Sequence, residues 1–165
     1  WLGWFGFNGG SVLSADPANT SLVLVTTCLA AAAGGLGASF LSTLMYKNLD
    51  ITMFMNGVLG GLVGITAGAD QMGPTSAIII GAIGGAVVVL GVALLDKCKL
   101  DDPVGAIPVH LFAGIWGTLA VGLFGASAGF DQFMVQLAST GIVGVFCVIG
   151  ASIICLLYTS DAADE

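Results

Sequence analysis

The chain has 165 residues, of which 57% are hydrophobic and 8% charged, and its formal net charge is −7. Soluble domains carry about 25% charged residues, so this composition excludes a water-soluble globular domain, and the 26 glycines follow no three-residue period that would indicate collagen. The basic residues are three lysines, which excludes a nucleic-acid-binding surface. A mean hydropathy of +1.05 predicts a membrane protein.

The charged residues fall in short stretches, and the segments between them are apolar. These uncharged segments run over 1–13, 21–46, 51–69, 75–95, 103–125 and 133–158. All but the first have about the 20 residues that a helix needs to cross a hydrocarbon core of about 30 Å. They are too long and too evenly apolar for the strands of a membrane barrel. The sequence therefore predicts an all-α polytopic transmembrane bundle with five full spans and one truncated span at its start.

The positions of the lysines predict the orientation of this bundle. Lys47, Lys97 and Lys99 lie in alternate loops, which places them on one side of the membrane. Because cytoplasmic loops carry the excess of lysine and arginine, we expect loops 47–50 and 96–102 in the cytoplasm.

Glycines and cysteines have ordinary structural interpretations in such a bundle. Glycines recur at four-residue spacing, as in Gly57-to-Gly61 and Gly81-to-Gly85, which predicts close helix packing within the bundle. The four cysteines form no short-spaced pair, so we expect no metal site, disulfide or cofactor.

The chain has one histidine, His110, and it falls within a predicted span. The segment Asp101-Asp102-Pro103 precedes it and supplies a helix N-cap followed by proline at the first helical position. Counted from Pro103 at 1.5 Å per residue, His110 lies about 10–12 Å into the helix, inside the hydrocarbon core. Ionisable residues in the membrane are functional candidates. The alternative is that His110 only packs, hydrogen-bonded to a neighbouring helix.

Pro108 lies close to this histidine. In a helix that starts at Pro103, Pro108 removes the amide that would bond the carbonyl of Val104. The sequence therefore predicts a kink and a free carbonyl near His110.

A second polar cluster opens the chain. Trp4, Phe7, Asn8 and Ser11 follow the spacing i, i+3, i+4 and i+7, which places them on one face of a helix. Aromatic faces attract cations, and a hydroxyl can replace a hydration water. The alternative is a stripe that packs or faces lipid.

Three segments of the chain carry a further pattern. The first is WFGFNGGS at 4–11 and the second is NGVLGGLVGIT at 56–66. The third runs from DDPVGA at 101–106 through Val109-His110 to GIWG at 114–117. In order and spacing these segments resemble the ammonium transporters (the Amt/Mep/Rhesus superfamily), and the Amt branch in particular, and the resemblance covers residues 1–157.

The resemblance implies a fold and an assembly. It implies an eleven-helix protomer, of which this chain supplies the sixth helix to the eleventh, and a homotrimer with one pore per protomer. It also implies a multi-pass protein of the plasma membrane that is not an enzyme. The first five helices, with the partner histidine and partner phenylalanine, would then lie outside this chain.

The resemblance also implies roles for individual residues. Trp4 lines the pore, Phe7 is one of two stacked gating phenylalanines, Ser11 belongs to the outer ammonium-recruiting site, and His110 is the second of twin pore histidines. The expected substrate is ammonium or ammonia.

Other residues have structural roles or depart from the family pattern. Asn8, Asp101 and Asp102 are expected to be structural. Leu111 and Phe112 follow the histidine where the family usually has glycine, and Pro108 is unusual. Residues 158–165 are expected to be a polar tail foreign to the family, and the family's own tail would dock a PII-type nitrogen signalling protein.

The chemistry of an apolar pore agrees with this substrate. Desolvation disfavours a charged ion, and ammonium can lose a proton to become neutral ammonia whereas sodium and potassium cannot. The alternatives on the same scaffold are an ammonium sensor and a purely structural membrane subunit.

Overall fold

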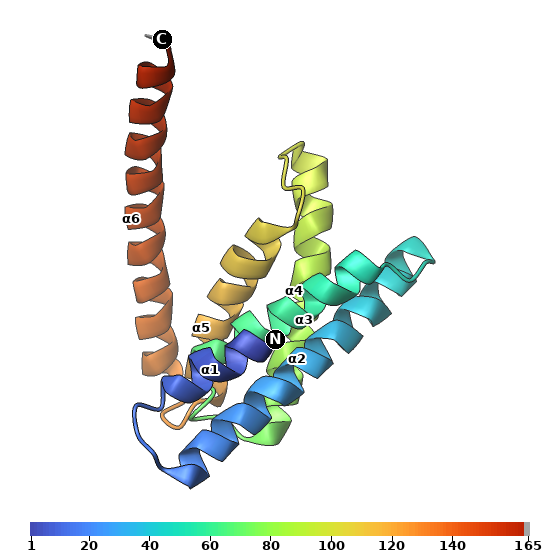
Figure 1. Cartoon of the computed structure of the whole chain (residues 1–165), viewed down its shortest axis with the longest axis vertical. Coiled ribbons are helices and arrows are strands. Elements are labelled where there is room, and N and C mark those ends of the chain that lie inside the picture. Colours follow the sequence, from blue (N-terminus) through green and yellow to red (C-terminus); the bar gives the residue numbers. More distant parts are fainter. Residues whose placement is uncertain (164–165) are drawn as a thin grey trace.

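The computed structural model describes residues 1–163, and the described part of the chain is helical without strands (Figure 1). The elements are α1 (Leu2–Gly10), α2 (Pro17–Tyr46), α3 (Ile51–Thr66), α4 (Pro74–Cys98), the π-helical turn η1 (Ile107–Phe112), α5 (Ala113–Phe124) and α6 (Phe130–Ala163). Each of the six uncharged segments forms a helix or a helical pair, so the predicted all-α bundle is confirmed.

Within the described residues, four stretches are long and apolar enough to cross a membrane: α2, α4, η1 with α5, and α6 over Phe130–Leu156. The sequence predicts a fifth full span over 51–69, but α3 ends at Thr66 after 16 residues. Residues 67–71 form turns instead. At 1.5 Å per residue, the 16 residues of α3 make a helix about 24 Å long.

The chain reverses direction at each loop, which separates the loops into two ends of the bundle (Figure 1). Loops 47–50 and 99–106 lie at one end, and loops 11–16, 67–73 and 125–129 lie at the other. The lysines therefore share one end, as their placement in alternate loops predicts.

The centre of the bundle is the packing of α2, α3 and α4, where the helix backbones touch. A Cβ atom on Gly84 of α4 would lie 2.6 Å from the carbonyl oxygen of Gly60 of α3. Only glycine therefore fits at this crossing, which confirms the expected packing within the bundle. A buried apolar cluster that includes Val23, Ile65 and Ile80 joins the same three helices.

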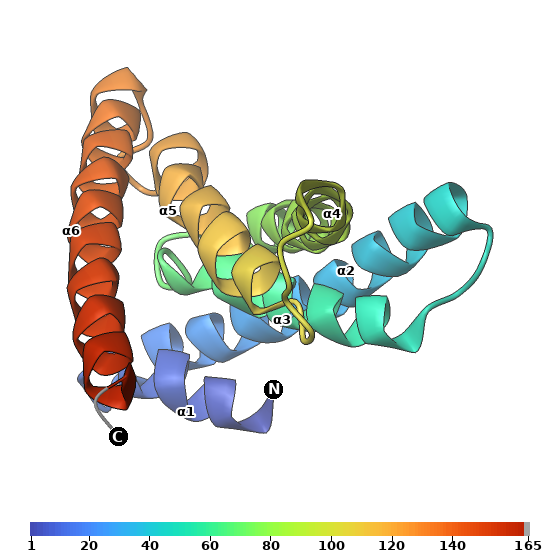
Figure 2. The same cartoon turned by 90° about the horizontal axis from the view of Figure 1, so that it is seen from above.

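Helix α6 stands apart from the others (Figures 1 and 2). It packs against α5 near its start and then runs away from the bundle. No residue of its apolar stretch Phe130–Leu156 is buried. This helix presents apolar side chains on all sides.

Candidate functional site

Trp4 of α1 is held by a hydrogen bond to α3. Its indole Nε1 donates to the hydroxyl of Thr66 at 2.8 Å, and that hydroxyl donates to the carbonyl of Leu62 at 2.6 Å. The ring of Phe7 meets that of Trp4 edge to face, with centroids 6.0 Å apart and planes at 76°. Phe7 is 57% exposed. The two rings thus form an aromatic face on α1 whose outer member is open.

Asn8 has a different environment from its neighbours on the same helix. It is 5% exposed, and its Nδ2 donates to the hydroxyl of Thr27 at 3.0 Å. This hydrogen bond joins α1 to α2. The face predicted from the spacing therefore divides into an aromatic part and an amide that points into the bundle.

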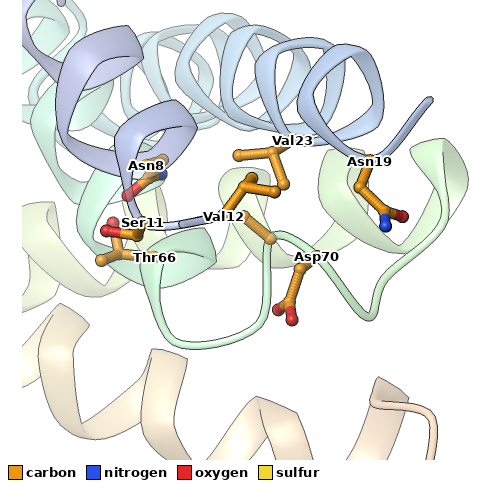
Figure 3. Close-up of a pocket in the computed structure, with 8 residues that line it drawn as sticks. Asn8, Ser11, Val12, Asn19, Val23, Thr66 and Asp70 are labelled. Carbon is orange, nitrogen blue, oxygen red and sulfur yellow. The ribbon is translucent and has the colours of Figure 1, made fainter. Parts of the chain in front are cut away.

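Ser11 follows α1 at the end of the bundle that has no lysine. Its hydroxyl donates to the carbonyl of Phe7 at 2.6 Å, and its side chain is exposed. It lines a pocket of about 290 Å³ between α1, α2 and the loop after α3 (Figure 3). The polar residues lining this pocket are Asn8, Ser11, Asn19, Thr66 and Asp70.

Sequence reasoning missed Thr66, Asn19 and Asp70. Thr66 carried a usable signal, because it is a lone hydroxyl at the end of an apolar helix within a quoted family segment. Asn19 lies in the first turn of α2 and Asp70 in the loop after α3, where polar residues are ordinary, and only the fold brings them to one pocket.

The helix that carries His110 begins later than the sequence predicts. Pro103 and Val104 form a turn, and the helical segment starts at Ile107 rather than at Pro103. Counted from Ile107, His110 lies only about 5 Å into the helix and not the expected 10–12 Å. The reason is Gly105, whose φ of +72° is incompatible with a continuous right-handed helix from Pro103.

Asp102 caps this later helix start. One carboxylate oxygen accepts from the amide of Ala106 at 2.9 Å, and the other accepts from the amide of Ile107 at 2.8 Å. The carboxylate thus satisfies two of the amides that a helix start leaves without an intrahelical partner. Asp101 lies exposed in the same loop.

The predicted free carbonyl near His110 is wrong, and Pro108 lies too early in the helix to break an intrahelical hydrogen bond. Pro108 falls in the first turn of the helix, where its missing N–H removes no intrahelical bond. The carbonyl of Val104 accepts a hydrogen bond of 3.0 Å from Nδ2 of Asn56 on α3. Residues 107–112 form a π-helical turn in which the amide of Ala113 bonds the carbonyl of Pro108.

His110 itself is exposed on η1, beside buried Pro108 and Val109. Trp4, Phe7 and Ser11 belong to α1 and its end, so His110 lies on a separate element. Within residues 1–163, no group of three or more His, Cys, Asp or Glu side chains could hold a metal ion.

A helix bundle with four apolar stretches of membrane-spanning length in its described residues is that of a polytopic membrane protein. The family model described as Ammonium Transporter Family matches residues 1–160. The chain belongs to this family.

Individual relatives agree with this assignment. Over 124 residues the chain is 47% identical to ammonium transporter Amt2 of Archaeoglobus fulgidus, covering 75% of this chain and 26% of that protein. The solved structure of Saccharomyces cerevisiae Mep2 superposes with a TM-score of 0.87 at 29% identity, covering 93% of this chain and 40% of Mep2. A structure described as a Sensor Amt Protein is 35% identical with a TM-score of 0.82, covering 86% of this chain and 37% of that one.

The chain is much shorter than the relatives that it matches. It spans between 18% and 34% of the length of the curated relatives compared with it. Those proteins are named as ammonium transporters and not as enzymes.

Proposed function

We propose that a protein containing this chain moves ammonium or ammonia across a membrane, through a pore to which Trp4, Phe7, Ser11 and His110 contribute. The observation that carries the proposal is the open aromatic and hydroxyl face at the end of α1, within a family segment. Phe7 is 57% exposed beside Trp4, and Ser11 opens on the polar pocket.

The end of α1 has the chemistry to collect a cation. An aromatic ring attracts a cation that lies within about 6 Å of its face. The hydroxyl of Ser11 donates to a carbonyl, which leaves its oxygen lone pairs able to accept from ammonium. Asp70 adds a negative charge at the same pocket. We therefore assign recruitment to Ser11, lining of the pore to Trp4, and gating to Phe7.

His110 has the chemistry to act further along the path. A neutral imidazole has one donor and one acceptor, enough to bond both a partner histidine and a passing ammonia. Its exposure on η1 leaves it accessible to a segment outside this chain. We propose that it is one of a histidine pair, and that the apolar surroundings favour ammonia over hydrated sodium or potassium.

Other residues are proposed to hold these groups in place. Asn8 joins α1 to α2 through Thr27, and Asp102 caps η1. Both are structural in this proposal, as is Asp101. The assembly is proposed to be a homotrimer in the plasma membrane, with the lysine loops in the cytoplasm and a PII-type protein as regulator. An ammonium sensor is less favoured, because the curated relatives are named as transporters.

The test is His110→Ala in a chimera that joins residues 1–157 to the first helices of the archaeal Amt2. We expect a folded trimer whose ammonium transport, or its selectivity over potassium, changes by about tenfold, which corresponds to about 1.4 kcal/mol. Leu123→Ala, an exposed residue on α5, is the control. Unchanged transport and selectivity per folded trimer would make His110 a packing residue, whose loss should only lower stability.

A further inference from the structure

Building on the proposed function, we infer that Asn56 is the positioning residue for His110. Its amide holds the loop before η1, and in this way it sets where the helix begins and where the imidazole points. Asn56 lies on α3, and Val104, which it bonds, precedes His110 by six residues.

The contact supplies a hydrogen bond that the helix itself does not make. Nδ2 of Asn56 donates to the carbonyl of Val104 at 3.0 Å, joining segments 48 residues apart. In a continuous helix from Pro103, this carbonyl would accept from residue 108, but Pro108 has no N–H. Asn56 thus satisfies an acceptor that this chain's own proline cannot serve. Without Asn56, the carbonyl of Val104 would lose its partner within this chain.

Gly105 fits around this contact. Its φ of +72° turns the chain between Val104 and the helix, and a Cβ atom there would lie 2.7 Å from Nδ2 of Asn56. A side chain at position 105 would therefore obstruct the hydrogen bond, because only glycine leaves room for the Asn56 amide to reach the carbonyl of Val104. Beyond the turn, Asp102 caps the first helical amides.

The helix start decides the direction of the histidine. The amide of Ala113 bonds the carbonyl of Pro108 rather than that of Val109, so η1 holds one more residue per turn than an α-helix. On one side of η1, Val109 packs in a cluster with Val88 of α4. If the helix began at a different residue, the π-helical turn would form at a different position in the chain. The side chain of His110 would then point in a new direction, while Val109 kept its apolar packing.

Two groups could orient the imidazole of His110: the apolar packing around Val109 and the amide of Asn56. If apolar packing alone oriented His110, loss of the Asn56 amide would leave transport unchanged. If Asn56 orients it, loss of the amide should alter transport only while His110 is present. Two substitutions and their combination distinguish these cases.

The experiment uses the chimera described above with Asn56→Leu, His110→Ala and the double variant. We expect Asn56→Leu to assemble as a trimer and to lower selectivity for ammonium over potassium several-fold. We expect the double variant to match His110→Ala alone. The control is Asn48→Leu, in the exposed loop before α3.

Two further variants guard against a folding defect. Asn56→Asp keeps the size of the side chain but loses the N–H donor, and Gly105→Ala displaces the amide from the other side. Both should reproduce the selectivity change. Normal selectivity in all three single variants would overturn the inference, as would a full additional loss in the double variant. The proposed function fails separately, if His110→Ala itself has no effect.

Discussion

Thr66 uses both sides of its hydroxyl at the junction of α1 and α3. The oxygen accepts from the Trp4 indole at 2.8 Å, and the proton goes to the carbonyl of Leu62 at 2.6 Å. The indole has a single donor, so this contact fixes the ring's direction as well as satisfying it. The orientation of the indole in turn affects Phe7, because the two rings are in edge-to-face contact.

The residue-scale prediction is that Thr66→Val loosens this aromatic face. Valine has the same shape but cannot accept the indole proton, so the half-buried donor of Trp4 loses its partner. The expected cost is about 1–3 kcal/mol of stability, with a weaker apparent affinity for ammonium. Thermal melting and uptake of the chimera measure both. Thr75→Val, exposed at the start of α4, is the matched control and should change neither.

At the scale of elements, α3 and α4 touch through their backbones. A methyl group on Gly84 would lie 2.6 Å from the carbonyl oxygen of Gly60, which is too close for both atoms to fit. Because the obstructing atom belongs to the backbone, it cannot move aside as the end of a flexible side chain could. Close approach of this kind replaces the hydrophobic driving force that helices lack in lipid.

We therefore expect Gly84→Ala to destabilise the helix pair even though alanine favours helices. The expected loss is about 1–3 kcal/mol, as for other overpacked sites. Unfolding in detergent gives this value directly. Gly144→Ala in α6, where an added Cβ meets nothing within 4 Å, should be neutral or stabilising. Equal behaviour of the two variants would contradict the packing found between α3 and α4.

For the whole molecule, the basic residues lie at one end of the bundle only. The end without lysine carries Asp16, Asp70 and Asp131, and the other end carries every lysine. The lysine end also carries Asp50, Asp96, Asp101 and Asp102, so the position of the lysines, and not net charge, distinguishes the two ends. Their position gives a direct test of orientation.

Cys98, exposed between Lys97 and Lys99, provides that test. With the other cysteines of the chimera changed to serine, a membrane-impermeant thiol reagent should label Cys98 only after cells are opened. Ser14→Cys, exposed at the lysine-free end, should be labelled in intact cells. The reverse pattern would show that the lysine loops lie outside.

The architecture followed from local properties of the chain. Segments of about 20 apolar residues can satisfy their backbones in lipid only as helices, so uncharged runs such as 21–46 and 75–95 predict spans. Local patterns also predicted the common end of the lysines, the helix cap at Asp102 and the close packing of glycines. Each of these depends on residues within a few positions of one another.

Parts of the candidate site could not be predicted from local rules. The face over Trp4, Phe7, Asn8 and Ser11 was found, but its division was not, because Asn8 turns inward to reach Thr27 on another helix. The helix start near His110 was placed too early for a similar reason. Gly105, with its φ of +72°, ends the right-handed path before the helix, and the adjoining carbonyl of Val104 is bonded by Asn56, which lies 48 residues earlier in the chain.

By itself the sequence determined an all-α membrane bundle, the family and the candidate residues, because period, length and charge are properties of neighbouring residues. Only the tertiary structure decided the shortened α3, the late start of η1 and the pocket shared by Ser11 and Asp70. Each of these depends on a backbone or side-chain group whose hydrogen-bond partner or packing surface belongs to a different helix. Spacing along the chain cannot specify such a partner, because it is the packing of the helices that brings the two groups together.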